Sequence, residues 1–117
     1  MKVEDLIIYK QYVELIYYTH QVLLKYPKIE RYSLVDDIKK QTYLGLEKII
    51  LTYKSYKPEQ KAMHLTQMDV CMKVLKVMIR VSCKNKYISS KNYASWSKKI
   101  ANICNLMGGW MKSCQKQ

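Results

Sequence analysis

Four cations in the second half of the chain are the residues best spaced to act together chemically. Lys73, Lys76, Arg80 and Lys84 follow one another at intervals of three, four and four, which places them on one face of a helix. The first three each follow an apolar residue of the expected core pattern, so this basic stripe is turned about 100° from the core seam and lies over a groove between helices. Ammonium and guanidinium groups in this pattern suit binding to phosphates or carboxylates.

The charge of the chain is distributed unevenly, and this favours a binding function for the basic stripe. Residues 1–69 carry 11 basic and 9 acidic side chains, whereas residues 70–117 carry 10 basic and no acidic ones. A field of one sign raises self-repulsion and indicates a polyanionic partner. A solvated face of flexible lysines is the alternative interpretation, but no Asp or Glu follows Asp69 to neutralise the stripe.

The side chains that catalysis requires are few. His20 falls on the apolar pattern of its segment, which is typical of a hydrogen-bonded core histidine. His64 and Cys71 are seven residues apart and could share a helix side, but two ligands make no zinc site. The adjacent carboxylates Asp36 and Asp37 fit the first turn of a helix. We therefore expect no enzymatic activity, no cofactor and no metal site.

The remaining composition argues against a membrane or secreted protein. The longest apolar runs are four residues, far below the roughly 20 that cross a bilayer. Acidic residues follow Lys2 at once, so no secretory leader is expected. The four cysteines have gaps that form neither a disulfide framework nor a metal knuckle, and we expect them to be reduced. These features predict a cytoplasmic protein.

The elements that position the basic stripe are predicted to be helices throughout. Apolar residues recur at intervals of three and four residues, as in helices. The 117 residues suffice for one domain, residues 1–117. Helices are expected at about 2–25, 34–54 and 58–84, and from Ser89 or Ser90 to the glycine pair at 108–109, with a partly structured tail from Trp110. Their lengths and short connections predict an all-α, antiparallel up-down-up-down four-helix bundle.

Several positions carry more specific expectations. Ser33 is a good N-cap for the second helix, and Gly45 within that helix suggests close contact with a neighbour. The core face of the first helix is expected to include Ile16, Leu23, Leu6, Val13, Tyr17, His20 and Leu24.

The chain has eleven tyrosines and no phenylalanine. Four of them, Tyr12, Tyr18, Tyr43 and Tyr56, fall off the main apolar pattern, so some should be exposed. They could stack on single-stranded RNA or form contacts between protomers. Partly buried tyrosines that replace the absent phenylalanine are an equally good interpretation.

Three stretches resemble the Avd family, the accessory variability determinants of diversity-generating retroelements. Residues 26–34 (Tyr-Pro-Lys-Ile-Glu-Arg-Tyr-Ser-Leu) resemble the junction between that family's first two helices. Residues 75–80 (Leu-Lys-Val-Met-Ile-Arg) resemble its Leu-Arg-x-x-Leu-Arg, and residues 106–112 (Leu-Met-Gly-Gly-Trp-Met-Lys) its closing Leu-Gly-Gly-Trp-hydrophobic-Lys. The related ribosomal-RNA intervening-sequence proteins share the bundle, but residues 41–49 lack their usual helix-two motif. Lys76 departs from the Avd pattern, in which Arg is commoner.

The resemblance implies a non-catalytic accessory protein that forms a homopentamer and binds reverse transcriptase. It also implies that the protein helps to hold template RNA, or an RNA/DNA hybrid, during mutagenic cDNA synthesis. The alternatives are an intervening-sequence-type bundle with a structural or RNA-binding role, and a purely structural oligomer with exposed Tyr and Met surfaces. Attachment to anionic lipid is disfavoured, because no helix has a large unpaired apolar face.

Overall fold

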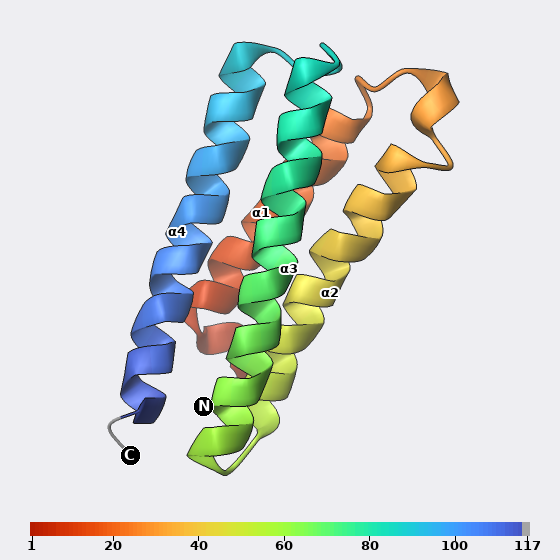
Figure 1. Ribbon diagram of the computed structural model, residues 1–117. Helices are drawn as coiled ribbons and strands as arrows, with labels where there is room; N and C mark the ends of the chain where they lie inside the picture. Colours follow the sequence, from red (N-terminus) through yellow and green to blue (C-terminus); the bar gives the residue numbers. More distant parts are fainter. Residues whose placement is uncertain (116–117) are drawn as a thin grey trace.

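The computed structural model describes residues 1–115, in which it contains four long helices and no strand (Figure 1). The long helices are α1 (Ile7–Leu23), α2 (Leu34–Lys54), α3 (Pro58–Lys84) and α4 (Ser90–Gln115), and two short 3-10 helices, η1 (Val3–Asp5) and η2 (Lys28–Glu30), flank α1. The predicted all-helical class is confirmed. The predicted domain also includes positions 116–117, which lie outside the described residues.

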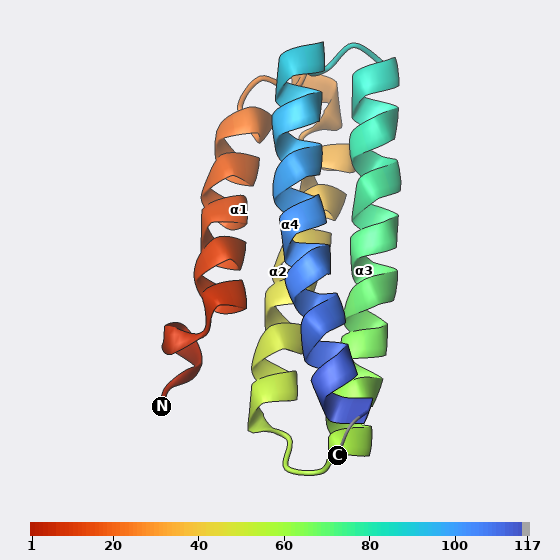
Figure 2. The same ribbon diagram turned by 90° about the vertical axis from the view of Figure 1, so that its left-hand side faces the viewer.

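The four helices form an elongated body of 46 × 24 × 23 Å, consistent with a four-helix bundle. Each helix packs against its neighbours in sequence, and α4 also packs against α1. In Figure 1 the helices α1 and α3 rise from the end that holds the N-terminus, and α2 and α4 return to it; Figure 2 shows α4 in front of α2 and between α1 and α3 in the turned view. One surface groove lies between α1 and α2, and another lies between α3 and α4.

The ends of the helices follow from local chemistry. The boundaries of α2 and α3 agree with the predicted ones, and Pro58 occupies the first position of α3, where its missing N–H costs nothing. Ser89 caps α4, because its hydroxyl accepts a hydrogen bond of 3.0 Å from the backbone N–H of Asn92. Ser33 does not cap α2 in the predicted way. Its hydroxyl donates to Glu30, whose carboxylate also accepts from the Leu34 N–H at 3.4 Å.

Two predicted helix ends are wrong. The first helix starts at Ile7 and not near Lys2, because Leu6 is extended, with ψ 136°, and η1 forms a separate turn before it. The fourth helix does not end at the glycine pair but continues to Gln115. Neither Gly108 nor Gly109 adopts a positive φ, and Cys114 beyond them is buried in the core. Burial of the last turns thus outweighs the poor helix propensity of the two glycines.

The core face of α1 is turned from the predicted one. Tyr17 and Leu24 were expected inside but are 62% and 86% exposed, whereas Tyr12 and Leu15 are fully buried. Tyr12 can be buried because its hydroxyl donates a hydrogen bond of 2.5 Å to the backbone carbonyl of Thr42. This satisfies the polar group that burial would otherwise penalise.

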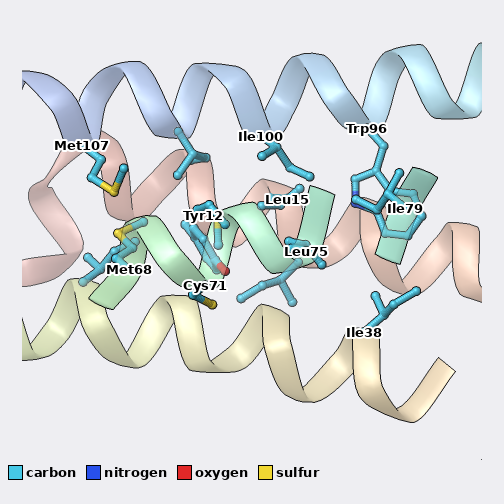
Figure 3. Packing of buried hydrophobic residues seen from close by; sticks show 14 of the residues in the cluster. Tyr12, Leu15, Ile38, Met68, Cys71, Leu75, Ile79, Trp96, Ile100 and Met107 are labelled. Atoms are coloured by element: carbon cyan, nitrogen blue, oxygen red, sulfur yellow. The ribbon is translucent and has the colours of Figure 1, made fainter. Parts of the chain in front are cut away.

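The core runs along the bundle axis and draws side chains from all four long helices (Figure 3). Its largest member is Trp96 of α4, which is fully buried and donates from Nε1 to Thr19 Oγ1 at 3.1 Å. The expected core positions of α3 and α4 that are buried are Leu65, Met68, Met72, Leu75, Ile79, Ile100, Ile103 and Met107. The close contact expected at Gly45 is also present, because Tyr12 and Met72 pack against that position.

Candidate functional site

The basic stripe lies on the exposed surface of α3. Lys73, Lys76, Arg80 and Lys84 are all exposed and follow one side of the helix. Burial raises the pKa of the Cys104 thiol on α4, and the positive charge of Lys76 acts in the opposite direction. Lys73 acts on this thiol in the same way, so the part of the stripe that contains Lys73 and Lys76 lies on the side of α3 that faces α4.

One of the four cations is engaged within the chain. Lys73 Nζ forms an ion pair of 2.9 Å with Asp69 one turn earlier, and the hydrogen bond from Lys73 to this carboxylate raises the pKa of Lys73. Lys76, Arg80 and Lys84 form no ion pair within residues 1–115. The sequence prediction overlooked the pairing of Lys73, although the i,i+4 spacing from Asp69 indicates it. Three cations of the stripe are therefore without an ion-pair partner within residues 1–115.

An apolar strip adjoins the basic stripe and was not predicted. Val70, Val74, Val77 and Val81 of α3 are between 39% and 58% exposed, at spacings of four, three and four. This valine strip lies on the side of α3 that faces away from the core, so packing within the bundle does not account for it. The same three-and-four spacing could have revealed it in the sequence. Contiguous exposed apolar area is a mark of interaction sites.

The four tyrosines singled out in the sequence have different environments. Tyr12 is buried, and the half-buried Tyr18 donates to the Asn92 carbonyl at 3.2 Å. Tyr43 and Tyr56 are 48% and 95% exposed. The expectation that some of the four are exposed is confirmed for these two. None of the four belongs to α3 or to the basic stripe.

The candidate catalytic and metal-binding residues do not converge. His20 is half-buried, with Nε2 2.9 Å from the Tyr43 hydroxyl. Cys71 is buried, and its Sγ donates to the Gln41 carbonyl at 3.1 Å. Among residues 1–115, no group of three or more His, Cys, Asp and Glu side chains could hold a metal ion. In the same residues no helix is long and apolar enough to cross a membrane.

Comparison with known families gives one match that covers nearly the whole chain. A family model described as bAvd-like matches residues 6–114, and these residues include all of α1, α2 and α3 and all but the last residue of α4. No curated protein matches the chain.

Proposed function

Since the chain belongs to the bAvd-like family, we propose that it is a non-catalytic accessory protein of a diversity-generating retroelement. In this role it binds the retroelement reverse transcriptase and template RNA through the basic stripe and supports mutagenic cDNA synthesis. Lys76, Arg80 and Lys84 make the principal contacts, and Lys73 contributes when it is released from Asp69.

The observation that carries this proposal is the set of exposed cations beside the α3–α4 groove. Lys76, Arg80 and Lys84 have no ion-pair partner within residues 1–115. Lysine contacts to phosphates fix position without reading bases, so binding to RNA is largely independent of sequence and weakens steeply with salt. The adjacent valine strip supplies apolar area that an RNA backbone does not need but a protein partner can cover.

The family also suggests how the protein is assembled. We propose a homopentamer of single-domain bundles, each with antiparallel up-down-up-down helices, in the cytoplasm. The exposed valine strip supports this assembly, because contiguous apolar area on a small domain favours association. Sedimentation velocity of the purified chain tests the pentamer directly, and a monomer at micromolar concentration would contradict it.

A charge-reversal pair tests the binding proposal. The variant Lys76→Glu/Arg80→Glu should lose association with the reverse transcriptase or RNA in a pull-down and in fluorescence anisotropy, with unchanged helicity. The control is Lys10→Glu/Lys57→Glu, which makes the same charge change at exposed positions of other segments. If the stripe variant binds both partners as well as the control does, the proposal is wrong.

A further inference from the structure

A second concave surface lies on the other pair of helices. The groove between α1 and α2, at the end where η2 connects them, forms a hollow with a volume of about 420 Å³. This volume lies within the usual range for small-molecule sites. Leu23, Pro27 and Val35 contribute apolar lining, and Lys28, Arg31 and Lys39 bring three positive charges to it. The basic stripe faces the α3–α4 groove, so the two surfaces share no residue.

The cations of this hollow form no ion pair within residues 1–115. No Asp or Glu lines it. Glu30 lies between two of its cations in sequence, but the Glu30 carboxylate accepts hydrogen bonds from the hydroxyls of Ser33 and Tyr87, the latter at 2.7 Å. Asp36 is also engaged, in an ion pair of 2.9 Å with Lys40. Glu30 and Asp36 therefore have other partners.

The fold accounts for some residues of the segment 26–34 and leaves others unexplained. Tyr26 is buried against Tyr87, with ring centroids 5.5 Å apart, and Glu30 holds the start of α2. The side chains of Lys28 and Arg31 form no hydrogen bond or ion pair within residues 1–115, and neither does that of Lys39. Three cations around one hollow without a structural role indicate a ligand that carries negative charge.

We propose that this hollow binds the terminal phosphate of a nucleotide. Lys28, Arg31 and Lys39 contact the phosphate oxygens, and the apolar lining accepts the sugar or the base. His20 also lines the hollow, and its Nε2 lies 2.9 Å from the Tyr43 hydroxyl. The ligand is either a free nucleoside triphosphate or the 5′-phosphorylated end of an RNA strand.

Three probes distinguish these two sources. Fluorescence anisotropy compares two labelled RNA pentanucleotides of one sequence, one with a 5′-phosphate and one with a 5′-hydroxyl, and calorimetry measures ATP. Tighter binding of the phosphorylated strand supports a strand end, and saturable ATP binding supports a free nucleotide. If the two strands bind equally and ATP does not bind, the proposal is overturned.

Variants then assign the binding to the hollow. Lys28→Gln/Arg31→Gln should weaken the affinity for the probe that binds about tenfold or more, because two charged hydrogen bonds to phosphate are lost. Leu24→Glu, at a lining position that is 86% exposed, should weaken it similarly without disturbing the core. The control Lys10→Gln/Lys57→Gln should bind as the unmodified chain does. An affinity unchanged in both hollow variants would overturn the proposal.

The outcome is independent of the proposed function. The hollow variants retain the basic stripe, and Lys76→Glu/Arg80→Glu retains the hollow. If the hollow variants lose their response to the phosphate probes but still associate with the reverse transcriptase, the nucleotide site is supported, whatever the stripe variant does. If only the stripe variant loses association with the reverse transcriptase, the proposal of a nucleotide site is unaffected.

Discussion

The ring of Tyr12 on α1 lies over Gly45 on α2 and occupies the space where a side chain at position 45 would begin. A β-carbon built on Gly45 would lie 2.7 Å from Tyr12 Cζ and 2.9 Å from Met72 Cε, and it would be closer still to the Tyr12 hydroxyl. The hydroxyl is held in place by its hydrogen bond to the Thr42 carbonyl. Glycine therefore lets α1 and α2 approach each other around a buried phenol.

Replacing this glycine should destabilise the bundle. Alanine normally stabilises a helix interior relative to glycine, but Gly45→Ala should lower the free energy of unfolding by about 1–3 kcal/mol, because the core is overpacked. Urea denaturation followed by circular dichroism measures the change. Gly108→Ala is the matched control: a β-carbon built at Gly108 meets nothing within 4 Å outside the adjoining backbone of α4, so this variant should raise the free energy of unfolding by about 1 kcal/mol. Equal effects at the two positions would contradict the close contact.

The hydrogen bond between Thr19 and Trp96 should be needed for stability. Thr19→Val keeps the shape of the side chain but leaves the buried Trp96 Nε1 without its acceptor, which should cost about 1–3 kcal/mol. Thr66→Val, at an exposed position of α3, should change stability by less than about 0.5 kcal/mol. Chemical denaturation of the two variants tests this, and similar midpoints would show that the indole does not depend on Thr19.

Glu30 should make the bundle sensitive to acid. Hydrogen bonds from the Ser33 and Tyr87 hydroxyls lower the pKa of the Glu30 carboxyl below its ordinary value, so the ionised form stabilises the fold. This contribution is complete above the ordinary pKa, about 4.3, and is lost as the pH falls through the lowered one.

The free energy of unfolding, measured with urea, should therefore fall less between pH 7 and pH 3 for Glu30→Gln than for the unmodified chain. Glu14→Gln, which removes an exposed carboxylate of α1, serves as the control and should retain the full acid sensitivity. An identical pH dependence in the Glu30 variant and the control would mean that the junction does not respond to ionisation of Glu30.

Removing the carboxylate beside the basic stripe should strengthen binding to an anionic partner. Asp69→Asn breaks the ion pair with Lys73 and leaves all four cations of the stripe free. Titration of RNA at several salt concentrations should show higher affinity and a steeper salt dependence than for the unmodified chain. Asp36→Asn, which breaks the equivalent pair with Lys40 on α2, should have a smaller effect. A weaker complex for the Asp69 variant would argue against the stripe as the binding surface.

Sequence periodicity predicted α2 and α3 well, because each is bounded by residues with strong local preferences, such as Pro58. It failed on α1, since Tyr12 falls off the predicted apolar pattern and only its hydrogen-bond partner, the Thr42 carbonyl, shows why it is buried. It also failed at the end of α4, because the burial of Cys114 is a tertiary effect that the glycine pair conceals.

The two candidate surfaces, the basic stripe and the hollow, also differ in how far the sequence predicts them. The alignment of Lys73, Lys76 and Arg80 on one face follows from helical geometry alone, so the basic stripe could be located in the sequence. The hollow between α1 and α2 could not, because Lys39 joins Lys28 and Arg31 only after the chain reverses at η2. A surface on one helix can be predicted from the spacing of its residues, whereas a surface between helices can be located only once the packing of the helices is known.

The hydrogen-bonded indole of Trp96 provides an intrinsic optical probe of folding. Trp96 is fully buried in the bundle, whereas Trp110, the other tryptophan, is half-buried near the end of α4. Their emission spectra should differ in wavelength and in accessibility to quenchers. Fraying of the last turns of α4 can thus be distinguished from melting of the interior without any added label.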